Sequence, residues 1–228
     1  AGFERIGGLS GGNSFTKINL LNRASVTVLA VGANNAATTW NGIIASTPSN
    51  GIDNGTNIGT WVIKEGTGKL TVTNAQTNDG VWHVDNGTLA VSGSGSLDDV
   101  SIVWAGNRTF AGNAYELNVS DTIAGLIGGG HGASRDFGLN GAPVGFITGN
   151  FIGGTGGNTV LNSTLTMNND VAANVYSYGG VLSGTGGITK VNRSTLELLG
   201  ANTYSGATTI SAASVDNTTS VLRLGVYG

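Results

Sequence analysis

Cysteine is missing from the 228 residues of this chain, and proline occurs only twice. Without cysteine the chain cannot form a disulfide, use a thiol nucleophile or build a cysteine-ligated zinc site. Proline interrupts paired strands because it lacks the backbone N–H that a β-ladder requires, so its scarcity favours continuous strand pairing. Apolar runs of about 18 residues are also missing, which predicts that no helix of this chain inserts into a membrane.

Charge is scarce as well. Charged residues make up 10% of the sequence and the net charge is −3, with the basic residues scattered singly. Nucleic acids and anionic membrane surfaces both bind a clustered basic face, so neither is an expected partner. Two histidines are too few for a histidine cluster, and the sequence has no phosphate-binding loop or calcium-binding repeat. We therefore expect no cofactor and no metal.

Glycine, by contrast, is abundant at 40 residues, and 39% of the chain is hydrophobic. Between glycine- and asparagine-rich corners lie short runs in which apolar and polar residues alternate, the pattern of strands with one buried face. Residues 182–225 show this pattern best, with strands expected at 188–191, 195–199 and 207–210. No helical spacing occurs there, so the sequence predicts an all-β fold.

The pattern recurs along the chain with a period that the tryptophans mark. The four tryptophans are separated by 21, 21 and 22 residues and are Trp40, Trp61, Trp82 and Trp104. Rungs of a solenoid take roughly 20 residues or more, so each tryptophan is expected at the same place on successive rungs, about 4.8 Å apart. A second expected ladder consists of leucine-rich strands at 69–72, 88–91, 116–120, 164–167, 195–199 and 221–224.

Residues 182–210 also resemble a known family motif, the passenger-associated transport repeat of bacterial autotransporters. The residues that match this pattern are Gly186, Gly187, Lys190, Thr195, Leu196, Leu198, Gly200, Asn202, Tyr204, Gly206, Thr208 and Ile210. The chain departs from the pattern at 191–194, where the family has a glycine-rich corner. The resemblance implies a right-handed parallel β-helix that is exported across the outer membrane of a Gram-negative bacterium to the cell surface.

The predicted architecture is a single β-solenoid over residues 1–228 with about eight to ten rungs. Residues 127–145 are too rich in glycine and charge for a regular rung, so they are expected to form an extruded loop. Residues 182–225 are the best-preserved repeat. Because Ala1 is neither a methionine nor part of a signal peptide, we interpret the chain as a segment of a larger precursor.

The function expected of such a rod is structural. It would be a stalk or fibre segment at the cell surface that supports adhesion or assembly and needs no catalytic residue. Its partners would be glycans or proteins on a host or cell surface. Neither end of the sequence carries a polar cap, so either further protein follows Gly228 or copies stack end to end into a filament.

An enzyme is the first alternative. The sequence around His131 resembles the Gly-His-Gly signature of polygalacturonase-like β-helix enzymes, and Asp98 and Asp99 lie about one and a half rungs earlier. Inverting glycosidases of this kind place a carboxylic acid and a carboxylate on opposite sides of the sugar. However, the upstream Asn-Thr-Asp and downstream Arg-x-Lys of that family are absent. The favoured interpretation of His131 is therefore a solvated side chain on a surface loop.

A glycan- or protein-binding module is the second alternative. Tryptophans that faced outward along a groove could stack on sugar rings, whereas tryptophans that faced inward would be core residues. We favour the structural interpretation. Arg135 and Asp136 are further binding candidates, although such a pair more often forms a local ion pair. For His83 we expect a surface imidazole beside Asp85 rather than a metal ligand.

Overall fold

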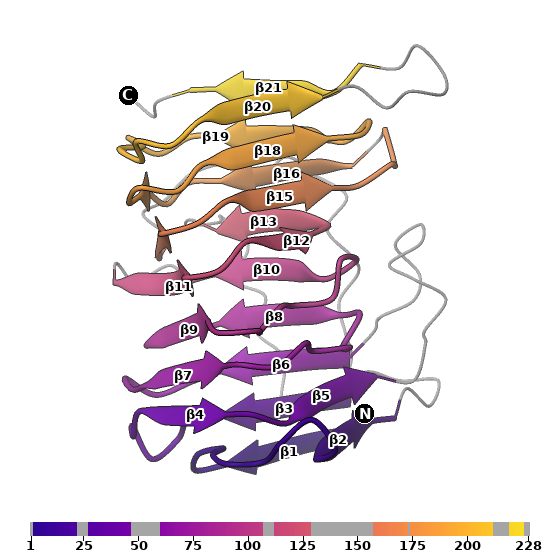
Figure 1. Cartoon of the computed structure of the whole chain (residues 1–228), viewed down its shortest axis with the longest axis vertical. Coiled ribbons are helices and arrows are strands. Elements are labelled where there is room, and N and C mark those ends of the chain that lie inside the picture. The colour runs from indigo at the N-terminus through magenta and orange to yellow at the C-terminus, as the bar shows by residue number, and fades with distance from the viewer. Residues whose placement is uncertain are drawn as a thin grey trace.

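The computed structural model describes residues 2–21, 27–46, 60–106, 112–128, 157–172, 174–211 and 219–225. Throughout these ranges the regular structure is β-strand, and the strands wind upward into a stack with the N-terminus at its lower end and the C-terminus at its upper end (Figure 1). None of the described segments forms a helix that is long and apolar enough to cross a membrane.

The longest sheet has nine strands, and each is paired in parallel with its neighbours in the stack. In order along the stack they are β1 (Gly2–Ile6), β3 (Thr27–Val31), β6 (Thr60–Lys64), β8 (Val81–Val84), β10 (Ile102–Ala105), β13 (Gly125–Gly128), β16 (Val175–Tyr178), β19 (Thr195–Leu198) and β21 (Val221–Leu224). Nine stacked strands agree with the predicted eight to ten rungs.

The second face is a six-stranded parallel sheet. Its strands are β4 (Thr38–Trp40), β7 (Lys69–Val72), β9 (Thr88–Val91), β11 (Asn113–Leu117), β14 (Asn158–Leu161) and β17 (Leu182–Ser183). The third face is divided between a two-stranded and a four-stranded sheet. Its strands are β2 (Lys17–Leu20) and β5 (Ile43–Ser46), then β12 (Asp121–Ile123), β15 (Leu165–Asn168), β18 (Ile188–Val191) and β20 (Thr208–Ser211).

The predicted parallel β-helix is therefore confirmed. Its interior consists of side chains that repeat at the same register position from rung to rung. On the nine-stranded sheet one such stack contains Val62, Trp82, Val103 and Leu126. On the six-stranded sheet the corresponding stack contains Val72, Val91, Leu117 and Leu161. All of these side chains are buried, and burial of apolar area is the main favourable term for each added rung.

The predicted tryptophan ladder is wrong. Trp61 pairs with Val81, Trp82 pairs with Val62 and Val103, and Trp104 pairs with His83. A rung takes 20 residues from β6 to β8, whereas the tryptophans recur after 21, so each tryptophan advances one position per rung. Because side chains alternate across a strand, a one-residue advance places the next tryptophan on the opposite face. Trp40 belongs to another sheet altogether.

The predicted leucine ladder is correct only in part. Leu70 pairs with Leu89, and Val72 with Val91, as expected. The strands at 164–167, 195–199 and 221–224, however, belong to the third face and to the nine-stranded sheet. Alternation shows that a strand has one buried face, but it does not show which side of the solenoid the strand occupies.

The predicted loop begins too early. Ile127 and Gly128, the first two residues of the range 127–145, are strand residues of β13. The rest of that range lies outside the described residues. The sequence departs from the family motif at 191–194, but the corner still forms. Asn192 adopts a φ of 63° there, the left-handed conformation that glycine usually supplies.

Candidate functional site

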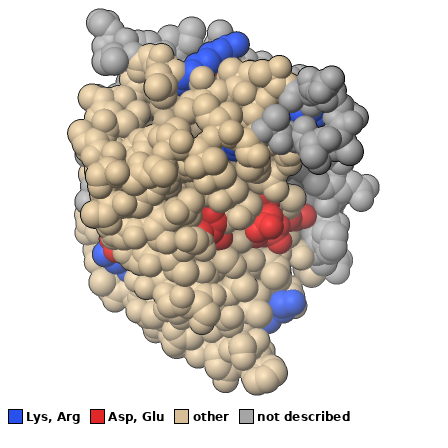
Figure 2. Space-filling model, turned by 45° about the horizontal axis from the view of Figure 1, so that its top comes forward, with Lys and Arg blue, Asp and Glu red and all other residues tan. Residues whose placement is uncertain are grey.

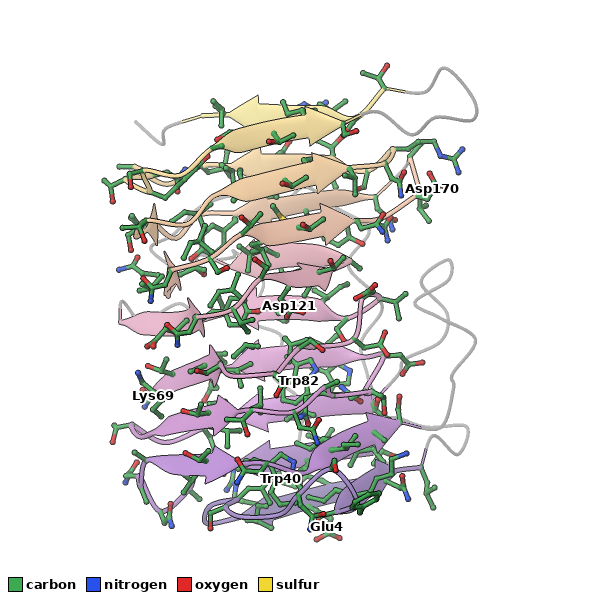
Figure 3. The ribbon with its side chains drawn as sticks, viewed as in Figure 1. Glu4, Trp40, Lys69, Trp82, Asp121 and Asp170 are labelled. Carbon is green, nitrogen blue, oxygen red and sulfur yellow. The ribbon has the colours of Figure 1, made fainter. Side chains whose placement is uncertain are left out.

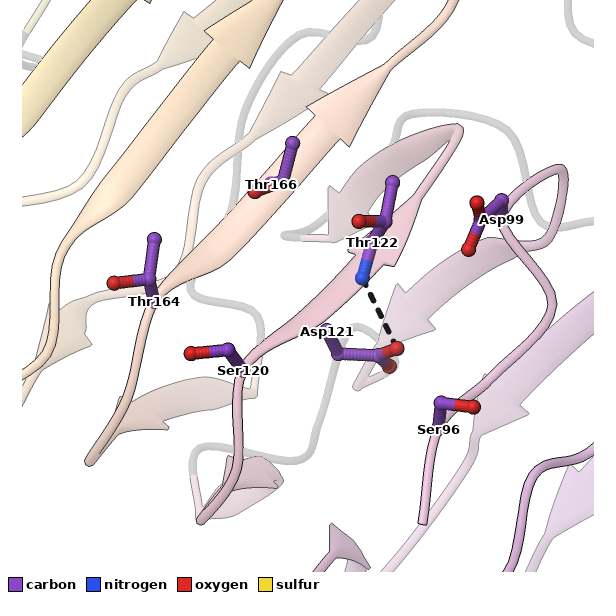
Figure 4. A pocket seen from close by; sticks show the side chains of 7 residues that line it. All are labelled: Ser96, Asp99, Ser120, Asp121, Thr122, Thr164 and Thr166. Atoms are coloured by element: carbon purple, nitrogen blue, oxygen red, sulfur yellow. Dashed lines mark hydrogen bonds between the residues drawn. The ribbon is translucent and has the colours of Figure 1, made fainter. Parts of the chain in front are cut away.

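The third face of the stack is interrupted between β5 and β12. In the described part of this interval, 74–80 and 95–101, single bridges between Ala45 and Thr77 and between Ala75 and Ser96 replace the regular ladder. An open hollow of about 410 Å³ lies beside the upper edge of this interruption (Figure 4). It is lined by Ser96, Asp99, Ser120, Asp121, Thr122, Thr164 and Thr166.

Asp121 is the most deeply placed residue of the hollow. It pairs with the core residue Leu165 in the strand register, so its side chain points inward, and only 6% of it is exposed. One carboxylate oxygen accepts the Leu97 N–H at 3.0 Å and the other accepts the Thr122 N–H at 3.0 Å. Burial raises the pKa of this carboxyl to about 6; the two N–H bonds oppose that rise and the negative charge of Asp99 adds to it.

A buried phenol lies next to this carboxyl. Tyr115 pairs with Leu89 on the six-stranded sheet, and its side chain is fully buried. Burial, followed by the nearby charge of Asp121, raises the pKa of the Tyr115 phenol well above its usual range. The phenol therefore stays protonated. The hollow itself combines one exposed carboxylate, that of Asp99, with the hydroxyl groups of its serine and threonine side chains.

Asp121 is also one of three side chains that perform the same task at different corners. Gln76, Asp121 and Asn202 each follow the last buried residue of a strand by four positions. Each one accepts a backbone N–H of the rung below. The bonds are Ile44 N to Gln76 Oε1 at 2.8 Å, Leu97 N to Asp121 Oδ2 at 3.0 Å and Leu182 N to Asn202 Oδ1 at 2.8 Å.

These bonds lie where regular pairing to the next rung stops. A buried N–H without a partner is costly, so a side-chain oxygen here replaces the missing backbone carbonyl. We call Gln76, Asp121 and Asn202 the rung-closing residues. The motif match found Asn202, but the sequence analysis missed Gln76 and Asp121. Their signal is a polar residue at a fixed spacing of four after the last apolar residue of a strand, in this case Val72 or Leu117.

Two buried lysines close other corners in a matching way. Lys64 Nζ donates to the carbonyl oxygens of Glu65 at 2.7 Å and Gly66 at 2.9 Å. Lys190 Nζ donates to those of the next two residues, Val191 at 2.6 Å and Asn192 at 3.1 Å. Burial lowers the pKa of both lysines to about 8. Lys64 is the last residue of β6 in the nine-stranded sheet, and Lys190 lies near the end of β18 in the four-stranded sheet. The same local motif therefore closes two different corners.

The tryptophans do not form a common binding groove. Trp40 and Trp82 are core residues, 4% and 1% exposed, and both lie inside the stack (Figure 3). Trp61 and Trp104 share the outward side of the nine-stranded sheet, with ring centroids 6.3 Å apart. His83 lies at the register position between their strands, with its ring 4.6 Å from that of Trp104.

The expected surface imidazole at His83 is wrong, because the side chain is only 7% exposed. Burial lowers the pKa of His83 to about 4, against the opposing effect of the Asp85 charge. The ring is therefore neutral at physiological pH. Throughout the described ranges, no group of three or more histidine, aspartate or glutamate side chains is placed to hold a metal ion.

The two carboxylates predicted for catalysis, Asp98 and Asp99, have different roles in the structure. Asp98 closes a tight turn, since its side chain accepts the Val100 N–H at 3.1 Å and its carbonyl accepts the Ser101 N–H at 2.8 Å. Asp99 is exposed and lines the hollow, where the second carboxylate is Asp121 rather than Asp98. The other predicted site residues, His131, Arg135 and Asp136, lie outside the described residues.

Charged side chains are sparse over the surface. Figure 2 shows a face that is mostly uncharged, with a few separate acidic and basic patches. Described ion pairs join residues on different rungs, as in Lys69–Glu116 at 2.6 Å and Arg193–Asp170 at 2.8 Å. Such exposed pairs add little stability. Among the described residues on the face in Figure 2, no broad surface of one sign is offered to a polyanion or polycation.

Comparison with known proteins agrees with this geometry. The family model of the passenger-associated transport repeat matches residues 62–91 and 188–215, the two stretches that contain the lysine corners. The adhesin BmaC autotransporter of Brucella suis biovar 1 (strain 1330) is 30% identical over 163 residues, which are 70% of this chain and 4% of that protein. No solved structure matches the chain.

The matched repeats are therefore built into a continuous parallel stack, and the similarity to the adhesin extends over most of its rungs. Passengers of this family are exported to the surface of Gram-negative bacteria, and this chain has the same localisation. The chain is an autotransporter passenger sequence that carries passenger-associated transport repeats.

Proposed function

We propose that this chain acts as a non-enzymatic rod that supports adhesion at the bacterial surface. The observation that carries the proposal is the nine-stranded parallel sheet into which both matched repeats are built. Strands in such a sheet are spaced about 4.8 Å apart, so the stack extends for about 40 Å along its axis. The similar protein from Brucella is named an adhesin, and a stiff exported rod suits that role.

A display experiment tests the adhesive part of the proposal. The chain is fused to a translocator that carries no passenger of its own and is displayed on a non-adherent bacterium, and binding to host cells is counted. The control is an unrelated β-helix of equal length, with surface exposure of both matched by antibody labelling. More bound bacteria than the control supports adhesion, whereas equal counts at equal display contradict it.

The non-enzymatic part has its own test. The purified chain is incubated with a panel of polysaccharides, pectin-like polymers included, and reducing ends are measured. We expect no turnover. Turnover that disappears in Asp99→Asn but persists in Glu4→Gln, an exposed carboxylate of β1, would overturn this part.

A glycan is the partner that the hollow would suit best. Sugar hydroxyls bind to exposed carboxylates and hydroxyls, and the hollow offers the Asp99 carboxylate with the side chains of Thr122, Thr164 and Thr166. We expect binding on a glycan array to weaken in Asp99→Asn and Thr166→Val but not in Glu4→Gln. Equal binding by all three variants would show that the hollow is not a glycan site. A protein would then be the proposed partner of the rod.

Self-association is a separate proposal. Among the described residues, β1 and β21 are the first and last strands of the nine-stranded sheet, and Phe3 and Leu224 on them are exposed. Exposed strand edges with apolar side chains favour pairing between copies. Sedimentation velocity over a range of concentrations should show oligomers that Leu224→Lys reduces. A strictly monomeric chain at every concentration would exclude end-to-end stacking.

A further inference from the structure

The corner that follows β8 contains an asparagine followed directly by a glycine, Asn86 and Gly87. An asparagine carboxamide reacts with the backbone nitrogen of the next residue when the two are held in contact, and glycine favours this reaction because it has no Cβ to obstruct the approach. Here the Gly87 N–H donates to Asn86 Oδ1 at 2.8 Å. This bond holds the carboxamide against the nitrogen that would attack it.

Lys64 acts on the same peptide group from the rung below. Its Nζ donates to the carbonyl oxygen of Asn86 at 3.2 Å. That oxygen and the Gly87 nitrogen belong to one resonance-stabilised amide, so a positive charge at the oxygen draws electron density from the nitrogen and makes its N–H more acidic. A Cβ added at Gly87 would lie 2.8 Å from Lys64 Nζ, so the ammonium group is close enough to stabilise an anionic nitrogen there.

The group that would leave in this reaction is unobstructed. Asn86 is half-buried, so water reaches it, and within the described residues its Nδ2 group makes no hydrogen bond that would hold it in place. The Gly87 N–H is bonded to this side chain rather than to a neighbouring rung. The corner therefore brings a nucleophile, an electrophile and a stabilising charge together without a competing contact.

We propose that Asn86 is a site of spontaneous deamidation that this corner of the β-helix promotes. The Gly87 nitrogen attacks Asn86 Cγ, the Cγ–Nδ2 bond breaks, and Nδ2 leaves as ammonia while solvent carries the Gly87 amide proton to it. Water then opens the cyclic imide at either carbonyl, which gives aspartate or isoaspartate. The modification goes beyond the proposed rod function, since it concerns how the displayed chain changes with time.

The product alters the lysine corner. Aspartate places a new negative charge beside the Lys64 ammonium, whereas isoaspartate lengthens the backbone of the corner by one atom. A Cβ added at Gly87 would lie 2.3 Å from the carbonyl oxygen of Gly68 and 2.5 Å from that of Gly66, so a displaced backbone has no room there. The isoaspartate form should therefore loosen this rung.

Mass spectrometry of the folded chain tests the proposal. The purified chain is incubated in oxygen-18 water near neutral pH and then digested in ordinary water, so that only acids formed in the folded chain carry the heavy oxygen. Fragmentation of the peptides assigns each acid to its residue and separates aspartate from isoaspartate.

Three other asparagines serve as internal controls, because each shares one feature with Asn86. Asn41 precedes a glycine, the Asn74 side chain accepts the N–H of the next residue, and the Asn192 carbonyl oxygen accepts a bond from Lys190. Asn86 combines all three features. We therefore expect it to convert at least about tenfold faster than any of the controls.

Asn41 gives the sharpest comparison, because it also precedes a glycine but its Oδ1 accepts the Thr73 hydroxyl at 2.5 Å. In urea, where the corners are lost, Asn41 and Asn86 should react at similar rates. An Asn86 rate in the folded chain that does not exceed that of Asn41 would overturn the proposal. The same preference for Asn86 in urea would overturn it too, because the local sequence rather than the corner would then explain the rate.

Lys64→Met tests the part assigned to the ammonium group. Under conditions in which circular dichroism shows the variant to be folded, it should slow the conversion of Asn86 and leave that of Asn41 unchanged. An unchanged or faster conversion of Asn86 would show that Lys64 does not promote the reaction. Should the variant fail to fold, the comparison of Asn86 with Asn41 in the unaltered chain still decides whether the corner promotes deamidation.

Discussion

Lys64 on one rung donates a hydrogen bond from Nζ to the carbonyl oxygen of Asn86 on the next rung, at 3.2 Å. The same ammonium group binds two carbonyl oxygens of its own corner, those of Glu65 and Gly66. One buried side chain thus joins two successive corners of the stack. Backbone carbonyls at a turn have no strand partner, and the lysine supplies the donors that they lack.

Replacing Lys64 by methionine should therefore destabilise the chain. Methionine keeps most of the apolar length of the side chain but leaves three carbonyl oxygens without their donor, which should lower the free energy of unfolding by about 2–4 kcal/mol. Urea unfolding followed by circular dichroism measures the loss. Lys69→Met is the matched control, because Lys69 is exposed and forms a surface ion pair with Glu116, so it should cost less than about 1 kcal/mol. Equal losses in both variants would contradict the corner role.

Trp82 should behave as a core residue rather than as part of a ligand surface. Truncation to alanine removes a large side chain from a filled stack between Val62 and Val103, at a cost of about 3–5 kcal/mol. Trp104→Ala, at a half-buried position on the outward side, should cost clearly less. The urea midpoints of the two variants give the comparison, and a Trp104 loss equal to that of Trp82 would argue against the assignment of faces.

The stability of the chain should depend on pH through Asp121. Its pKa is about 6 in the folded chain, above its usual value of 3.8, so folding favours the protonated form. The stabilisation is fully present below pH 3.8 and is lost as the pH rises through 6. The difference between these two values corresponds to about 3 kcal/mol.

Asp121→Asn should remove this dependence. The free energy of unfolding, measured by urea at several pH values between 4 and 7.5, should fall more steeply with pH in the unaltered chain than in the variant. Other carboxylates contribute to both curves alike, so the difference between the curves isolates Asp121. Parallel curves would show that the carboxyl does not titrate in this range.

Gly66 and Asn192 both adopt a positive φ at the corner that follows a buried lysine, and together they give a paired test. An added Cβ at Gly66 would lie 2.0 Å from the carbonyl oxygen of Gly32, so Gly66→Ala should cost about 2–3 kcal/mol. At the equivalent corner Asn192 already adopts a φ of 63°. Asn192→Ala should cost about 1 kcal/mol more than Asn192→Gly, because both variants lose the side chain and only alanine is strained there. Thermal unfolding of the three variants gives the order, and equal stability of Asn192→Ala and Asn192→Gly would contradict it.

The sequence contained enough information for the class of fold but not for its register. Short alternating runs and glycine-rich corners predict strands, and the transport-repeat motif implies a parallel β-helix; both expectations agree with the structure. The position of each residue around the axis depends on rung length, which is 20 residues between β6 and β8, 23 between β10 and β13 and 26 between β19 and β21. An error of one residue reverses a side chain, as Trp82 illustrates.

The candidate site was harder to find. Asp99 was singled out as an acid for catalysis, and it does line the hollow, but its neighbour there is Asp121. The one sequence signal for Asp121 is its spacing of four after Leu117, and this signal is weak because an aspartate after a turn is usually solvated. Its role becomes visible when Gln76 and Asn202 are found to accept the same kind of backbone N–H bond at their own corners.

The lysine corners have a consequence for how such rods are built. Lys64 lies at the corner between β6 and β7, and Lys190 at the corner between β18 and β19, which join different pairs of faces. The local unit that recurs is thus a bend with its two flanking strands rather than a complete turn of the coil. Each bend depends on its own lysine and on the two carbonyl oxygens that follow it, and not on which two faces of the stack it joins.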